Sequence, residues 1–213
     1  MLADTLIFVA AYFLGSIPTG FLAGRMKGID IRAAGSGNIG ATNALRVLGK
    51  PAGILVLVID GLKGYAAAAW LVSALLPALG ASGADAEPVR IGAGIAAVLG
   101  HNYPCWLKFK GGKGVATSAG VYFALAPLAA GIAVATFALT VALTRYVSVG
   151  SMAAAIALPT AVWCLDGNNL MLGIVTTVVG AMVIFRHKSN IKRLLAGTEN
   201  RLGRPREAGE GAK

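Results

Sequence analysis

The chain has 213 residues, of which 56% are hydrophobic and only 13% are charged, and its formal net charge is +10. Soluble domains carry roughly 25% charged residues, so this composition excludes an ordinary soluble protein and predicts an integral membrane protein. The positive charges fall between long apolar runs. That pattern favours membrane orientation and phosphate ligands as their role, and we expect no nucleic-acid partner.

Apolar segments follow one another along almost the whole chain. A helix needs about 20 apolar residues to cross a bilayer. The candidates in chain order are residues 3–24, 52–79, 90–107, 114–127, 128–144, 147–165 and 168–185. They predict an all-α integral membrane protein with a single transmembrane domain over residues 1–203. Residues 204–213 are expected to form a disordered basic and polar cytoplasmic tail.

The uncharged run over residues 114–144 decides the topology. If this run crosses the membrane twice and turns near Pro127, every basic residue except Lys63 and Arg90 lies on one side. The positive-inside rule therefore predicts seven transmembrane helices, with the N-terminus outside and the C-terminus in the cytoplasm. A short re-entrant hairpin over residues 114–144 would leave the same ends in the cytoplasm, and this alternative stays open.

Two ionisable residues, Asp60 and Lys63, lie inside the second apolar segment. Residues three apart share one side of a helix, so the two side chains can face each other. Charges at this depth are costly and usually pair or face an interior. Two interpretations remain: a buried pair that sets the rotation of the helix, or groups that shape a polar substrate cavity.

The first polar segment, residues 35–49, combines closely spaced glycines with hydrogen-bond donors. These donors are Ser36, Asn38, Thr42, Asn43 and Arg46. Neutral donors beside one guanidinium suit a phosphate and adjacent hydroxyls. Thr42 and Arg46 are four apart, so one face of a helix can carry both. The alternative is a capped helix at the membrane surface.

The second polar segment, residues 108–118, contains three lysines and three glycines. Its candidate phosphate-binding residues are Gly111, Gly112, Lys113, Gly114 and Thr117. Glycines allow close approach of the backbone, and their N–H groups with a helix start and a lysine make an anion site. The alternative is a flexible basic turn. His101 precedes this segment and is either catalytic or a helix-end histidine satisfied by backbone.

Two further segments carry polar groups towards the same side of the membrane. Ser148 and Ser151 lie at the turn into the sixth apolar segment, where they bind a ligand or cap the helix. His187 and Asn190 lie three apart in a basic stretch after the last apolar segment. Alone, such a stretch is most often a helix that binds lipid headgroups. Beside the other polar segments, it favours a shared site. Glu199 is a candidate partner for a nearby arginine.

Several short motifs in the polar segments occur in an order that resembles one known family. Gly-Ser-Gly-Asn and Asn-Ala-Leu-Arg fall within residues 35–49, and Gly-His and Phe-Lys-Gly-Gly-Lys-Gly-Val-Ala-Thr within 100–117. Arg-His-Lys-Ser-Asn over residues 186–190 and Gly-Thr-Glu over 197–199 complete the set. Each motif is weak alone, but their order and spacing across nearly the whole chain are specific. The chain resembles the bacterial membrane acyl-phosphate:glycerol-3-phosphate acyltransferase family (PlsY).

The resemblance implies transfer of a fatty acyl group from acyl phosphate to the 1-hydroxyl of sn-glycerol 3-phosphate, giving lysophosphatidic acid and phosphate. It implies that Ser36, Arg46 and Lys113 contact substrate phosphates, helped by the amides of residues 111–114. Ser151, His187 and Asn190 would lie at the reacting centre. The expected location is the bacterial cytoplasmic (inner) membrane, multi-pass, with the active site facing the cytoplasm. Membrane lipids and a soluble enzyme that produces the acyl phosphate are candidate partners. We expect no cofactor and no metal ion.

The residues leave two questions open: which group accepts the proton of the attacking hydroxyl, and whether the protein is an enzyme. His187 can accept the proton of the attacking hydroxyl, or a substrate phosphate accepts it while His187 and Asn190 orient the groups. Cationic surroundings lower the basicity of a histidine, which favours the substrate phosphate. A transporter for a phosphorylated metabolite, or a lipid-binding scaffold, would also explain basic loops on a membrane bundle.

Overall fold

The computed structural model describes residues 1–80 and 86–203, and within these ranges it contains helices and no strand. The predicted tail over 204–213 lies outside the described residues. Short helical turns also lie at Ile31–Ala33, Ala67–Leu71 and Cys105–Leu107. The main helices are α1 Leu2–Ser16, α2 Thr19–Met26, α3 Ala41–Leu48, α4 Lys50–Ala66, α5 Val72–Ala78, α6 Ala86–Asn102, α7 Val115–Leu125, α8 Pro127–Thr144, α9 Val147–Leu165, α10 Leu170–Arg186 and α11 Lys188–Leu195.

The helices follow the predicted apolar segments, but they differ in how well they suit a bilayer. Four helical stretches among the described residues are long and apolar enough to cross: Leu2–Met26, Lys50–Ala78, α8 and α9. The pair α10–α11, bent by 51°, is a fifth candidate only if the two helices are counted together as one broken span. Helix α7 has 11 residues, or about 16 Å at 1.5 Å per residue, against a hydrocarbon core of about 30 Å. Helix α6 carries Glu87 and Arg90 in its 17 residues. The seven crossings therefore stay a prediction.

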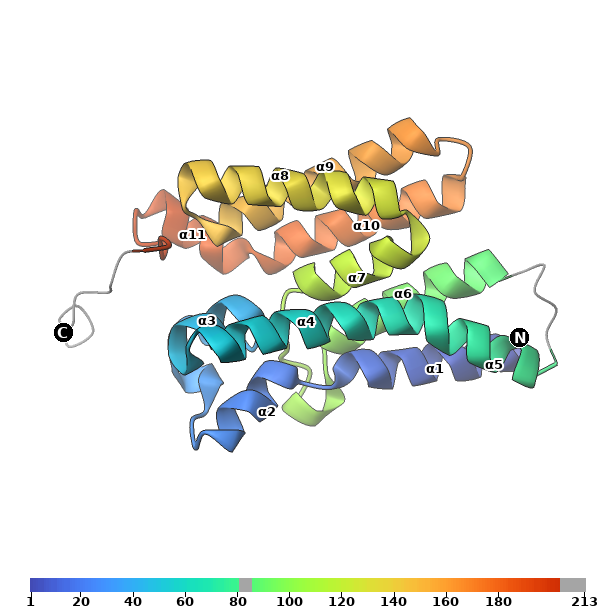
Figure 1. The fold of residues 1–213 in the computed structure, drawn as a ribbon, viewed down its shortest axis with the longest axis horizontal. Helices are drawn as coiled ribbons and strands as arrows, with labels where there is room; N and C mark the ends of the chain where they lie inside the picture. Colours follow the sequence, from blue (N-terminus) through green and yellow to red (C-terminus); the bar gives the residue numbers. More distant parts are fainter. Residues whose placement is uncertain (81–85, 204–213) are drawn as a thin grey trace.

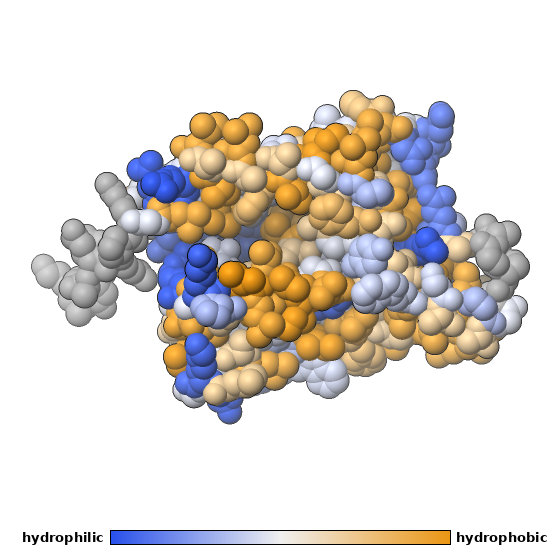
Figure 2. Space-filling view, in the orientation of Figure 1, coloured by the Kyte–Doolittle hydropathy of each residue, from blue (hydrophilic) through white to orange (hydrophobic). Residues whose placement is uncertain are grey.

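Figure 1 shows how the helices are layered. Helices α8, α9 and α10 form one layer, α1, α4 and α6 form the other, and α7 lies between them. The run over residues 114–144 is a helical hairpin that turns at Ala126, as its proline predicted. Hydrophilic residues gather at the two ends of the molecule and hydrophobic residues cover its middle (Figure 2), as expected for a protein that lies across a bilayer.

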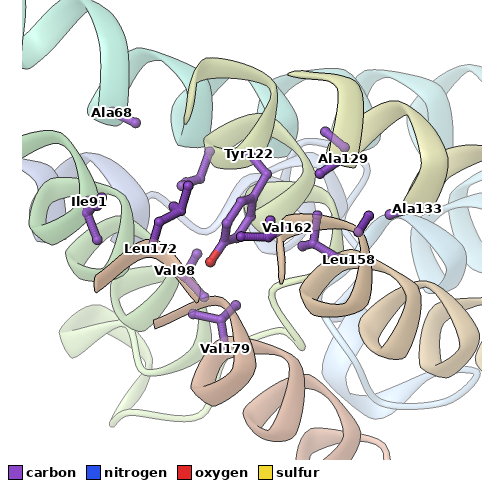
Figure 3. Close-up of a cluster of buried hydrophobic side chains, with 13 residues drawn as sticks. Ala68, Ile91, Val98, Tyr122, Ala129, Ala133, Leu158, Val162, Leu172 and Val179 are labelled. Atoms are coloured by element: carbon purple, nitrogen blue, oxygen red, sulfur yellow. The ribbon is translucent and has the colours of Figure 1, made fainter. Parts of the chain in front are cut away.

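The core is built around the short helix α7. Tyr122 is 2% exposed, and its ring lies among side chains from α6, α8, α9 and α10 (Figure 3). The labelled members of this cluster are Ala68, Ile91, Val98, Tyr122, Ala129, Ala133, Leu158, Val162, Leu172 and Val179. Side chains from four other helices therefore cover the Tyr122 face of α7, while Phe123 on the same helix is 43% exposed.

Glycines bring α4 and α7 into backbone contact. A Cβ added at Gly120 would lie 1.9 Å from the carbonyl oxygen of Gly61, and one at Gly64 would lie 2.1 Å from that of Thr117. We expect Gly120→Ala to lower the stability of the folded protein in detergent by more than about 2 kcal/mol, because backbone must move. Gly131→Ala on α8 is the matched control, since its Cβ would meet nothing within 4 Å. Equal thermal unfolding midpoints for the two variants would contradict the close packing.

Candidate active site

A cavity of about 700 Å³ opens among α3, α4, α7, α8, α9, α10 and α11. Most of its polar lining comes from the end of the molecule where α3 and α11 lie (Figure 1), and Asp60 and His101 also line it. This lining includes Ser36, Asn38, Thr42, Asn43, Arg46, Lys113, Gly114, Ser148, Ser151, His187, Asn190, Arg193 and Glu199. The deeper lining is apolar and includes Leu57, Leu62, Phe123, Val134, Phe137 and Leu158. Four polar segments that are far apart in the sequence thus meet at one cavity.

Asn43 organises the first of these segments. Its amide nitrogen donates to the carbonyl oxygens of Ile31, Ala34 and Asn38 at 2.9–3.1 Å, and its Oδ1 accepts from the Ser36 amide at 2.8 Å. The side chain is 1% exposed. The donors around Asn43 predicted that it binds substrate, but these hydrogen bonds show that its side chain holds the loop. Thr42 and Arg46 share α3 and both line the cavity, as their spacing predicted.

The glycine-rich loop in residues 108–114 differs from the phosphate-binding segment that the sequence predicted. The Gly111 and Gly112 amides donate to the carbonyl oxygens of Asn102 and His101 at 3.1 and 3.0 Å, so protein carbonyls already accept from them. Neither glycine lines the cavity, and neither does Thr117, which is fully buried. Lys113 and Gly114 do line it.

Gly114 begins helix α7 in the left-handed region at φ +81°, and no side chain caps the helix. The first amides of a helix lack intrahelical partners. Val115 and Ala116, the first residues of this helix, both line the cavity, so their amides have the geometry that suits an anion and that the Gly111 and Gly112 amides lack.

Lys113 is the cation that the glycine-rich loop contributes to the polar lining. Its ammonium donates to Oδ1 of Asn190, which joins the glycine-rich loop to α11. Burial and the nearby Arg193 guanidinium lower the pKa of Lys113 to about 8. An anionic ligand would oppose both effects and hold the lysine protonated.

His187 is buried at the junction of α10 and α11. Its Nδ1 lies 2.8 Å from the Val183 carbonyl oxygen, which can only accept, so Nδ1 carries the proton and Nε2 keeps its lone pair. Burial and the charge of Lys113 lower the pKa of His187 to about 4. Its imidazole is therefore neutral at pH 7 and is a weak base. Ser151 donates to the Val147 carbonyl oxygen at 2.9 Å and does not cap α9.

Glu199 connects three polar groups of the cavity, a role that the sequence did not indicate. Its Oε1 accepts from Ser148 at 2.9 Å and from Asn190 at 2.6 Å, and its Oε2 accepts from Arg193 at 2.6 Å. Burial opposes its ionisation, but these hydrogen bonds hold the pKa of Glu199 below its usual value. The predicted pairing with an arginine is confirmed. Ser148 binds this carboxylate and does not cap the helix.

Asp60 and Lys63 form the pair that their spacing allowed, at 2.8 Å, with both side chains almost fully buried. Thr19 also donates to Asp60 Oδ1 at 3.0 Å, and Lys63 donates to the Ile17 carbonyl oxygen at 2.9 Å. The pair thus binds the break between α1 and α2. His101 Nδ1 lies 3.6 Å from Asp60 Oδ1. The expectation that backbone satisfies the His101 ring was therefore wrong.

Clusters of side chains that could bind a metal ion are absent from the described residues. Within residues 1–80 and 86–203, no three His, Cys, Asp or Glu side chains are grouped so that they could hold a metal ion. The arrangement combines a cationic, hydrogen-bonding end with an apolar interior. It can bind a phosphate group and an attached hydrocarbon chain in one cavity.

Comparisons with known proteins agree on one family. A family model described as glycerol-3-phosphate acyltransferase matches residues 5–197. The glycerol-3-phosphate acyltransferase of Trichlorobacter lovleyi is 48% identical over 202 residues, which cover 94% of this chain and 98% of the relative. That of Geobacter metallireducens is 50% identical over 202 residues with the same coverage.

Solved structures give the same result. The crystal structure of PlsY (YgiH), an integral membrane glycerol 3-phosphate acyltransferase, in its glycerol 3-phosphate form is similar to this chain with a TM-score of 0.84 and 41% identity. The similarity covers 94% of this chain and 96% of that one. Its lysophosphatidic acid form has a TM-score of 0.81 and 40% identity, and covers 94% and 95%.

Proposed function

The chain belongs to the glycerol-3-phosphate acyltransferase family, and from this premise we propose its donor, product and catalytic residues. The protein is an integral membrane acyltransferase of phospholipid synthesis. It transfers a fatty acyl group from an acyl phosphate to the 1-hydroxyl of sn-glycerol 3-phosphate. The hydroxyl oxygen bonds to the acyl carbon, the bond from that carbon to the phosphate oxygen breaks, and phosphate leaves with the electron pair. The products are lysophosphatidic acid and inorganic phosphate.

The composition of the cavity is the observation that carries this proposal. Its cationic end holds Arg46, Lys113 and Arg193, and its deeper wall is apolar. The polar acceptor and the phosphate of the acyl donor can therefore both bind at the cationic end, while the acyl chain of the donor lies along the apolar wall. Helices α4 and α8 both line the cavity, which suits sideways entry of an acyl chain from the bilayer.

We assign phosphate binding to Ser36, Arg46 and Lys113, with the first amides of α7. Asn38 and Thr42 supply further donors at the acceptor side. Ser151, His187 and Asn190 lie at the reacting centre, where they orient the hydroxyl and the acyl phosphate. Preorganised donors of this kind stabilise the charge that develops on the leaving phosphate.

The seven predicted crossings, with the N-terminus outside and the C-terminus in the cytoplasm, place this cavity on the cytoplasmic side of the inner membrane. In Figure 1 the N-terminus and α11 lie at opposite ends, as an odd number of crossings requires. A soluble acyl-phosphate-producing enzyme could then deliver the donor to the membrane surface. Labelling of Leu2→Cys and of Arg201→Cys with a membrane-impermeant thiol reagent, in intact and in lysed cells, would test the locations of the N-terminus and of the C-terminus separately.

The reaction is tested with purified protein, labelled glycerol 3-phosphate, and palmitoyl phosphate or palmitoyl-CoA as parallel donors. We expect lysophosphatidic acid from the acyl phosphate only. Product from palmitoyl-CoA alone would overturn the donor assignment. Counterflow of glycerol 3-phosphate in vesicles, without acylation by either donor, would instead show a transporter.

The alkaline limb of the pH profile should report Lys113. Because the pKa of Lys113 is lowered to about 8, the free enzyme loses this positive charge as pH rises through that value. We therefore expect kcat/KM for glycerol 3-phosphate to fall above about pH 8. In Lys113→Arg, whose guanidinium stays protonated, the limb should move to higher pH. An unchanged limb in that variant would assign it to another group.

His187→Gln separates the two candidate bases. A neutral histidine with a pKa of about 4 is a poor proton acceptor, so we expect the substrate phosphate to take the proton. The variant should lose less than about tenfold in kcat, whereas general base catalysis is worth about 10²–10⁴-fold. A loss of 10³-fold in kcat with unchanged KM would make His187 the base.

A further inference from the structure

Arg186, the last residue of α10, reaches across to the glycine-rich loop. Its Nε and Nη2 donate to the Gly112 carbonyl oxygen at 3.1 and 2.7 Å, and Nη2 donates to the Gly111 oxygen at 3.1 Å. The Tyr103 ring lies 5.1 Å from the guanidinium carbon. In the described part of the chain, no carboxylate is within ion-pair distance of Arg186.

The same two peptides are held from the opposite side by α6. The Gly111 and Gly112 amides donate to the carbonyl oxygens of Asn102 and His101. The backbone of each glycine is therefore held at its N–H by α6 and at its C=O by Arg186. Position 112 has no room for a side chain, because a Cβ there would lie 1.9 Å from Nε2 of His101.

The arginine joins two parts of the cavity through its neighbours in sequence. Lys113 follows Gly112 directly, and His187 follows Arg186 directly. The bonds from Arg186 to Gly112 thus fix the distance between Lys113 and the segment from His187 to Asn190. The contact between Lys113 and Asn190 closes the same loop on the cavity side.

We propose that Arg186 is a positioning residue for acyl transfer, which holds the Gly111–Gly112 peptides so that Lys113 meets Asn190 and the substrate phosphate. This inference rests on the proposed function, since acyl transfer is its readout. In the sequence, Arg186 belongs to the basic stretch after the last apolar segment, where a positive charge alone would suffice. The structure instead uses the planar fork of donors, which a lysine cannot reproduce.

Arg186→Lys is the deciding variant, because it keeps the charge and loses the fork. Misplacement of a catalytic group by about 1 Å can cost about 10²-fold in rate. We expect kcat to fall at least about tenfold and KM for glycerol 3-phosphate to rise. Lys188→Met removes an exposed charge two residues away and should stay within about twofold of wild type. Wild-type kcat and KM in Arg186→Lys would overturn the proposal.

A loss of fold is separated from a loss of position by measuring the thermal unfolding midpoint and kcat per folded molecule. A normal kcat per folded molecule in Arg186→Lys would also overturn the positioning role. If wild-type protein transferred no acyl group from any donor, the proposed function alone would fail. Calorimetric binding of glycerol 3-phosphate would then decide, with equal affinity of wild type and Arg186→Lys overturning the inference.

Discussion

Lys113→Met should lower kcat/KM for acyl transfer by about 10²–10³-fold, the cost of removing one preorganised donor to developing charge. The lysine is half-buried in the cavity and donates a hydrogen bond to Asn190. The other cations that line the cavity, Arg46 and Arg193, lie on α3 and α11 and not on the loop that carries Lys113. Methionine keeps the length and volume of the side chain and removes only the ammonium. The measurement is steady-state lysophosphatidic acid formation with both substrates varied.

Lys110→Met is the matched control for this variant. Lys110 belongs to the same loop, but it is exposed and does not line the cavity. Its replacement should change kcat/KM less than about twofold beyond any shared effect of net charge at the membrane surface. If both variants lost the same factor, long-range attraction of the anionic substrates would explain Lys113 and a direct contact would not.

The sequence predicted where helices form and which polar segments meet, because both follow from local patterns. The proline at position 127 marked the hairpin turn, and the spacing of Thr42 and Arg46 placed them on one helix face. Positive-inside counting put the polar segments on one side of the membrane. Four polar segments predicted on one side of the membrane were therefore expected to share a site.

Local sequence patterns did not predict which side chains of distant segments contact one another. Asn43 looked like a substrate ligand because its neighbours are donors, yet its amide closes a loop onto Ile31, Ala34 and Asn38. The Gly111 and Gly112 amides looked free until α6 supplied their acceptors. Glu199 lies 48 residues or more from Ser148 and Ser151, and only the folded chain shows that it organises Ser148, Asn190 and Arg193.

Lys63→Met should cost the folded protein about 3 kcal/mol, the largest stability change that we expect from one side chain. Removing one member of a buried ion pair leaves the other charge uncompensated, which typically costs about 3–5 kcal/mol. We expect the lower end because Thr19 still donates to Asp60 and His101 lies 3.6 Å away. The variant also loses the bond to the Ile17 carbonyl oxygen, where α1 breaks before α2. Unfolding in mixed micelles measures the change.

The double variant Asp60→Leu/Lys63→Met distinguishes pairing from packing. Replacing a whole buried ion pair by apolar residues is often neutral or stabilising, so the double variant should recover most of the loss. Lys50→Met, at the exposed start of the same helix, controls for the lost charge. A double variant less stable than Lys63→Met would mean that Asp60 contributes chiefly through its contacts with Thr19 and His101. Asp60, on α4, would then stabilise the fold by holding the start of α2 and the end of α6.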